Sequence, residues 1–190
     1  MDVLRNARLR FKSFSYSGPR RDRWQLPDDV IAALAVKEGS LVADLGAGGG
    51  YFTFRLARAV GPQGVVYAVD TDADMSLLIS QKASADKVGN VVTVAATPDD
   101  PVLPQPVDLV LTVNAFHHLP EPATYFATVA KYLDPDGRVA VIEAYPKWYV
   151  FGHATQPVTI ASAMADAGYT LAERHDFLRR QSFQIFARRT

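Results

Sequence analysis

The 190-residue sequence holds 20 basic and 20 acidic residues, and its zero net charge argues against a protein that binds nucleic acid through bulk electrostatics. A hydrophobic share of 48% and a charged share of 21% are typical of one globular domain with a full core. The absence of cysteine excludes disulfides and thiolate chemistry, and no apolar run is long enough to span a bilayer. We therefore expect a cytoplasmic protein without a membrane segment.

The N-terminal stretch, residues 1–23, is the only charge-biased part of the chain. It carries seven Arg or Lys residues against two Asp, with Phe11, Phe14 and Tyr16 between them. Such a composition suits a lid over a ligand site, a basic patch for an anionic substrate, or a terminal arm with a solvated face. We divide the chain into this basic arm or lid and a domain of residues 24–190.

The domain is predicted to begin with a helix, in which Pro27 takes the first turn and Val30 and Leu34 lie on the apolar side. The stretch 41–50, LVADLGAGGG, then reads as a buried strand that stops at a cluster of glycines. Residues 51–60 follow with apolar side chains at helical spacing. A strand, a glycine turn and a helix in this order bind a nucleotide at the carboxyl end of a parallel strand.

The acidic residue in this loop indicates which nucleotide. Asp44 lies two residues before Gly46, where its charge would repel a pyrophosphate and attract a ligand with an ammonium and a sulfonium group. The glycine pattern also differs from G-x-G-x-x-G, because Tyr51 stands at the position of its third glycine. No lysine follows, so the loop is not a P-loop. These features point to S-adenosylmethionine.

The segment DLGAGGGYFTFRLA resembles motif I of the class I S-adenosylmethionine-dependent methyltransferases, whose pattern is roughly (D/E)-x-G-x-G-x-G. A plain glycine-rich turn between a strand and a helix is the alternative interpretation. The resemblance implies that the cofactor-binding residues of this motif are Asp44, Gly46, Ala47, Gly48 and Gly50.

Asp70 is the second anchor, at the end of a predicted strand over residues 65–70 and 24 residues after Gly46. A carboxylate at about this spacing can accept hydrogen bonds from both ribose hydroxyls. The resemblance makes this motif II, with Thr71 and Asp72 beside the adenine. The alternative role for Asp70 is to cap the helix that begins near residue 73.

The residue expected to contact the adenine differs from the one found in many family members. Residues 88–96 predict a third strand, and in many family members an aspartate after this strand receives the adenine amino group. Thr97 occupies that place here and Pro98 follows it. The contact is therefore expected from the Thr97 hydroxyl or a backbone carbonyl of this turn, with Asp99 as the alternative acceptor.

A fourth buried strand, residues 107–113, ends in NAFHHL. This ending resembles motif IV of small-molecule methyltransferases and not the (N/D/S)-P-P-(Y/F) form of enzymes that methylate adenine bases or glutamine. The resemblance places Asn114 in the cofactor site. His117 and His118 point in different directions because they are adjacent, and no partner at metal-ligand spacing accompanies them, so we expect no metal.

The rest of the chain completes a doubly wound α/β fold. We expect a helix over 120–133, a strand over 138–143, an aromatic loop over 144–152, a helix over 157–167 and strands over 169–174 and 183–187. The aromatic loop would either overhang the cofactor or complete the core. The resemblance implies a seven-stranded, mostly parallel sheet in the order 3-2-1-4-5-7-6.

The functional expectation is a small S-adenosylmethionine-dependent methyltransferase that acts on a small-molecule acceptor, without a nucleic-acid partner. If the reaction needs a general base, the candidates are His118, His153, Tyr145 and Glu143. An RNA or protein methyltransferase and a non-catalytic S-adenosylmethionine-binding protein are the alternatives. We further expect the arm and the aromatic loop to meet over the cofactor, with His153 near the rim of the pocket.

Overall fold

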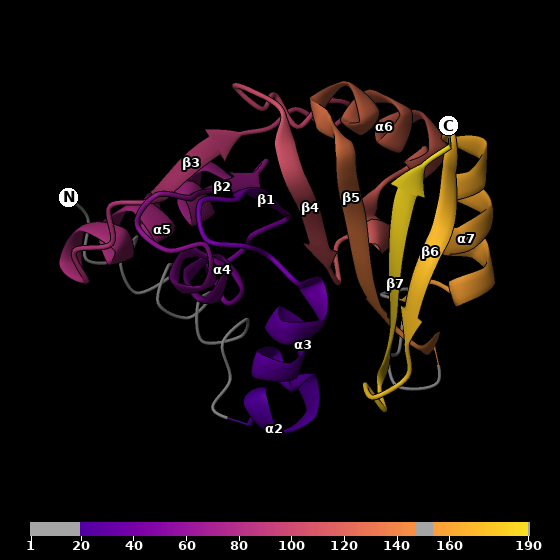
Figure 1. Ribbon diagram of the computed structural model, residues 1–190, viewed down its shortest axis with the longest axis horizontal. Coiled ribbons are helices and arrows are strands. Elements are labelled where there is room, and N and C mark those ends of the chain that lie inside the picture. The colour runs from indigo at the N-terminus through magenta and orange to yellow at the C-terminus, as the bar shows by residue number, and fades with distance from the viewer. Residues whose placement is uncertain (1–19, 147–153, 190) are drawn as a thin grey trace.

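The computed structural model describes residues 20–146 and 154–189, which form a three-layer α/β fold (Figure 1). Its sheet has seven strands in the order β3-β2-β1-β4-β5-β7-β6. The strands are β1 (Leu41–Leu45), β2 (Val65–Asp70), β3 (Val91–Ala95), β4 (Val107–Val113), β5 (Leu133–Ala144), β6 (Tyr169–His175) and β7 (Gln181–Arg188). Strands β1 to β5 pair in parallel, and β7 lies antiparallel between β5 and β6. The predicted fold class and strand order are confirmed.

Helices cover both faces of this sheet. They are α2 (Asp22–Gln25), α3 (Pro27–Leu34), α4 (Thr53–Ala59), α5 (Ala73–Ala85), α6 (Pro122–Val129) and α7 (Pro157–Asp166). On one face, Leu34 of α3 and Leu56 of α4 pack with Val42 of β1. On the other face, Phe126 of α6 packs with Val110 of β4. The alternation of side chains along β1 and β4 divides the core between the two faces.

Parallel pairing brings the ends of the central strands to one edge of the sheet. Leu45 of β1 is level with Val69 of β2 on one side and with Thr112 of β4 on the other. The residues that follow these positions therefore emerge next to each other, at the carboxyl edge where open α/β sheets bind ligands.

Several boundaries differ from the sequence-based expectation. Strand β3 is shorter than residues 88–96, and α6 ends at Val129, where a 3₁₀ turn (Ala130–Tyr132) leads directly into β5. The strand expected over 138–143 is part of a longer β5 that begins at Leu133, and its register with β4 shifts between Val107 and Leu109. Helix α2 crosses the boundary drawn between residues 23 and 24.

Two expectations concern residues outside the described part of the chain. Most of the basic arm, most of the aromatic loop and His153 lie there, so their expected meeting over the cofactor stays a prediction. Across residues 20–146 and 154–189, no helix is long and apolar enough to cross a membrane.

Candidate cofactor-binding site

The glycine loop has a backbone that other residues adopt only with strain. Gly46, Gly48 and Gly50 have φ values of +72°, +52° and +78°. The N–H groups of Gly46 and Ala47 both donate to the Val69 carbonyl, at 2.9 and 3.1 Å, which ties the loop to β2. A Cβ on Gly46 would lie 2.5 Å from the Cβ of Ala115, so only glycine fits between the loop and the end of β4.

Asp70 joins the glycine loop to the loop after β2. Its Oδ2 accepts a hydrogen bond from the Gly48 N–H at 2.8 Å, and its Oδ1 accepts one from the Asp72 N–H at 2.9 Å. The cap of α5 is supplied by Asp72, whose side chain accepts from the Asp74 N–H at 2.9 Å. Asp70 is therefore not the helix cap, and each of its oxygens has a further lone pair for a ligand hydroxyl.

Asp44 is a buried carboxylate, only 3% exposed, on the face of β1 that packs against α4. Its Oδ2 accepts a hydrogen bond of 2.6 Å from the Thr53 hydroxyl at the start of that helix. Burial raises the pKa of Asp44 to about 6, although the Thr53 hydrogen bond and the positive charge of Arg21 oppose the rise. A cationic ligand would favour the ionised form, so the position is suited to positive charge.

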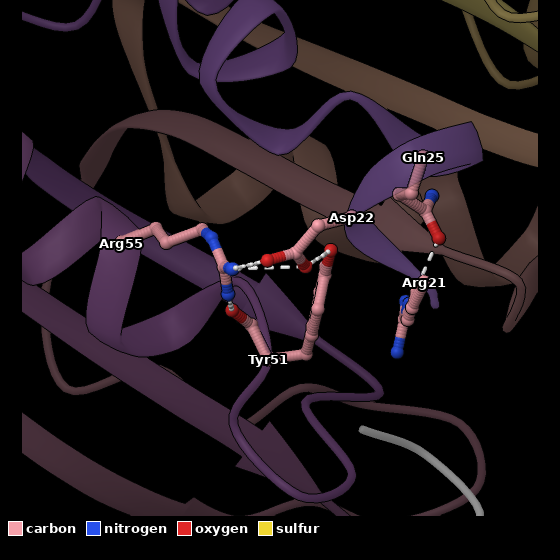
Figure 2. Close-up of polar contacts among 5 residues, drawn as sticks. All are labelled: Arg21, Asp22, Gln25, Tyr51 and Arg55. Carbon is pink, nitrogen blue, oxygen red and sulfur yellow. Dashed lines mark hydrogen bonds and ion pairs between the residues drawn. The ribbon is translucent and has the colours of Figure 1, made fainter. Parts of the chain in front are cut away.

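The start of helix α2 contacts Tyr51, the residue that follows the glycine loop (Figure 2). The Arg21 guanidinium lies 3.8 Å from the centre of the Tyr51 ring, a cation–π contact. The Tyr51 hydroxyl donates to Asp22, which also accepts from Nη2 of Arg55 at 3.1 Å. The contacts of Arg21 and Asp22 with Tyr51 and Arg55 therefore hold α2 against the start of α4.

A chain of side-chain amides connects α2 to the end of β4. Nε of Arg21 donates to Oε1 of Gln25 at 2.9 Å, and Nε2 of Gln25 donates to Oε1 of Gln181 at 2.7 Å. Nε2 of Gln181 in turn donates to Oδ1 of Asn114 at 2.8 Å. Gln25 and Gln181 are buried, and Asn114 has a left-handed backbone with φ +53°. Asn114 is thus oriented by a residue far away in sequence.

These elements surround a cavity of about 760 Å³ at the carboxyl edge of the sheet. The lining contains most of the residues expected to bind the cofactor, namely Asp44, Gly46, Ala47, Gly48, Asp70, Thr71, Thr97, Pro98 and Asn114. Gly50 is not among the lining residues, and a Cβ at Gly50 would meet the Phe54 ring at 2.8 Å. Asp99, the alternative adenine acceptor, is not among the lining residues.

The candidates for a general base differ in whether they line the cavity. His118 lines the cavity as an exposed residue at its rim, whereas Glu143 is fully buried behind it. The Tyr145 N–H donates to the Arg180 carbonyl at 3.0 Å, and Tyr145 is not part of the lining. His153 lies outside the described residues.

His117 connects the cavity to the buried Glu143. It lines the cavity, and its Nδ1 lies 2.9 Å from Oε1 of Glu143. Burial raises the pKa of Glu143 to about 7, while backbone N–H groups of Ala144, His117 and Phe116 oppose that rise. The described residues contain no group of three or more His, Asp or Glu side chains arranged to hold a metal ion.

Sequence reasoning misses several residues of the cavity lining, and two of them carry polar or charged groups that bear on its chemistry, Arg21 and His117. The charge pattern groups Arg21 with the basic arm. The signal in the sequence that could have separated Arg21 from the arm is the acidic Asp22 next to it, which bonds to Tyr51 and Arg55. For the adjacent histidines, the sequence does not say which one reaches Glu143, because that depends on the 3₁₀ turn after β4 (Phe116–His118).

The strand order, the left-handed glycine loop between two acidic strand ends, and the cavity beside it define the class I methyltransferase fold. The methyltransferase domain family model matches residues 43–139, about half of the chain. The chain belongs to this family.

Curated relatives and solved structures agree with this assignment. The chain is 31% identical to an arsenite methyltransferase of Halobacterium salinarum over 111 residues, 58% of this chain and 28% of that protein. It is also 31% identical to the ubiquinone/menaquinone biosynthesis C-methyltransferase UbiE of Burkholderia mallei over 122 residues, 63% of this chain and 49% of that protein. The chain thus spans half or less of the length of these curated relatives.

Among solved structures, an S-adenosylmethionine-dependent methyltransferase from Aquifex aeolicus superposes with a TM-score of 0.84 at 22% identity, covering 92% of this chain and 96% of that one. Magnesium protoporphyrin IX methyltransferase from Synechocystis PCC 6803, solved with bound S-adenosylmethionine, gives a TM-score of 0.67 at 21% identity over 90% of this chain and 81% of that one. At these identities the likeness establishes the fold.

Proposed function

We propose that this protein binds S-adenosylmethionine and transfers its methyl group to a small-molecule acceptor. The observation that carries the proposal is the pair of carboxylates on either side of the glycine loop. Asp70 offers its remaining lone pairs to ribose hydroxyls, and the buried Asp44 offers negative charge to the cationic amino-acid end. Thr71, Thr97 and Pro98 would border the adenine, and Asn114 would complete the site from β4.

The residues fit such a ligand. Gly46 and Gly48 line the cavity without side chains, so a ligand can approach the loop backbone closely. Asp44 is buried without a basic hydrogen-bonding partner among the described residues, an arrangement that a cationic ligand would stabilise. The cavity of about 760 Å³ lies within the range of small-ligand sites, roughly 300–1,000 Å³.

When bound, S-adenosylmethionine supplies an electrophilic methyl group: an acceptor lone pair forms the new bond to carbon, and the pair of the broken carbon–sulfur bond stays on sulfur. The protein's share is to place the acceptor and to exclude water. Of the four general-base candidates for acceptors that must lose a proton, His118 lines the cavity, Tyr145 and Glu143 do not, and His153 lies outside the described residues.

A small acceptor is supported by the names of the relatives, which give arsenite and magnesium protoporphyrin IX as substrates of those proteins. The zero net charge also disfavours RNA. Since the cofactor is an intracellular metabolite, a cytoplasmic location is part of the same proposal. A salt-dependent gel shift with RNA would favour the RNA methyltransferase alternative.

Calorimetric titration with S-adenosylmethionine, S-adenosylhomocysteine and NADH tests the cofactor. We expect binding of the first two and none of NADH, and tighter binding of NADH would contradict the proposal. Transfer from [methyl-³H]S-adenosylmethionine into small molecules then separates an enzyme from a non-catalytic binding protein, which would bind the cofactor and transfer nothing.

A further inference from the structure

The buried pair of His117 and Glu143 leaves one carboxylate oxygen unsatisfied within the part of the protein that the structure describes. Glu143 is 0% exposed at the end of β5, and its Oε2 has no hydrogen-bond partner among the described residues. Burying a carboxylate with an unsatisfied oxygen is unfavourable, and a glutamine or an apolar residue would avoid that penalty. A buried acid beside a ligand cavity is instead typical of a functional site.

The geometry determines how this acid can act. Glu143 is not part of the cavity lining, so it does not reach a ligand there directly. His117 is part of the lining, and its side chain is 7% exposed. Because Nδ1 is engaged by Oε1 of Glu143 at 2.9 Å, proton exchange with a ligand falls to Nε2.

Both the side chain and the backbone of Glu143 are held in place. Its Oε1 also accepts from the Ala144 N–H at 3.1 Å, and its backbone carbonyl accepts from the Ser182 hydroxyl of β7 at 3.3 Å. A second titratable side chain, that of His118, lies beside the pair, with its ring centre 4.0 Å from that of His117. A base oriented by a buried carboxylate keeps the correct tautomer and is stabilised once it is protonated.

We propose that His117 is the general base of this enzyme and Glu143 its positioning residue, and that the acceptor is a small hydroxyl-bearing molecule. The inference rests on the proposed methyltransferase function. In the proposed step the acceptor O–H bond breaks, its proton passes to Nε2 of His117, and its electron pair stays on oxygen to attack the methyl carbon. The imidazolium is paired with the Glu143 carboxylate and releases its proton to water after the methyl transfer.

The first test needs no acceptor. In ¹⁵N-histidine NMR, the His117 Nδ1–H bonded to Glu143 should give a downfield proton signal that disappears in both His117→Gln and Glu143→Gln. The signal should persist in His175→Gln, a control on β6 whose ring packs on Phe183 with centroids 4.7 Å apart. A wild-type spectrum without such a signal would overturn the pair.

The second test is kinetic, with [methyl-³H]S-adenosylmethionine and a panel of phenols and aliphatic alcohols. His117→Gln should lower kcat by about 10²–10⁴-fold, the usual contribution of a general base, and leave the affinity for S-adenosylhomocysteine unchanged. Glu143→Gln should lower kcat less and shift the acidic limb of the pH profile, and Glu143→Asp should restore part of the rate. His175→Gln should match the wild type.

The outcomes separate the two proposals. If the wild type binds no S-adenosylhomocysteine, the proposed function is wrong. If it transfers methyl groups and His117→Gln does so equally well, or if His118→Gln causes the larger loss, the present inference is wrong. A wild type that binds the cofactor and methylates no hydroxyl compound of the panel would overturn the assigned acceptor class.

Discussion

The backbone N–H of Gly48 donates a hydrogen bond to Oδ2 of Asp70 at 2.8 Å, across the gap between the ends of β1 and β2. The glycine loop and the expected ribose acceptor are therefore one hydrogen-bonded unit before any ligand binds. Such preorganisation lowers the entropic cost of forming the site. It also means that a change at Asp70 acts on the loop as well as on the ligand.

Replacing Asp70 with alanine is expected to weaken the binding of S-adenosylhomocysteine by about 1.5–3 kcal/mol, the range for hydrogen bonds to a charged group. Isothermal titration calorimetry measures this loss. Asp108→Ala is the matched control, because Asp108 also accepts a backbone hydrogen bond, from the Leu41 N–H at the opposite end of β1. Unchanged affinity in Asp70→Ala would exclude the ribose role.

Replacing Asp44 with asparagine should raise stability above pH 6. The pKa of Asp44 is about 6 in the folded protein, against an ordinary value of 3.8 for an exposed aspartate. The folded state therefore binds the extra proton, and the wild type loses stability as pH rises from 4 to 6. Asparagine does not titrate, so the variant does not lose this stability. At about 1.4 kcal/mol per pKa unit, the rise from 3.8 to about 6 corresponds to at most about 3 kcal/mol of unfolding free energy. Thermal denaturation from pH 4 to 8 measures the difference.

The same substitution should weaken the binding of S-adenosylmethionine, because the neutral amide no longer attracts a cation. Wild-type affinity should rise with pH up to about 6, as Asp44 ionises, and the Asp44→Asn affinity should stay flat. If Asp44→Asn is less stable than the wild type and binds S-adenosylmethionine with the same affinity, Asp44 serves the fold alone.

Gly46→Ala should destabilise the protein more than Gly39→Ala. Both glycines have positive φ, +72° and +85°, so both variants suffer the backbone strain of about 1 kcal/mol or more. At Gly46 the new Cβ would additionally lie 2.5 Å from the Cβ of Ala115, while at Gly39 it would meet nothing within 4 Å. Chemical denaturation gives the two losses. Ala115→Gly should recover part of the Gly46→Ala loss, and no recovery would argue against the clash.

Gln181→Leu should lower the free energy of unfolding by about 1–3 kcal/mol, because it leaves the buried Gln25 amide without its acceptor. Gln184→Leu, the same substitution three residues along β7, should be neutral or stabilising, since Oε1 of Gln184 has no partner among the described residues. Urea denaturation of both variants tests this contrast. Equal losses would indicate that packing volume, and not the amide chain, dominates at this strand.

Local sequence determined much of this protein. The strand, glycine turn and helix around Gly46 follow from short-range propensities, and the parallel order of the strands brings Asp44, Asp70 and Asn114 to one edge of the sheet. These positions could be read from motifs because backbone conformation and strand topology are encoded within a few residues of each.

Side-chain partnerships across the fold were decided by the tertiary structure alone. Gln25 and Gln181 meet across 156 positions, and His117 meets Glu143 across 26. Which of two adjacent histidines turns inward depends on the rotation of a 3₁₀ turn against β5, and the position of Arg21 depends on the packing of α2 over Tyr51. Hydrogen bonds and ring contacts require geometry within a few tenths of an ångström, which the packing of distant elements sets and local sequence does not.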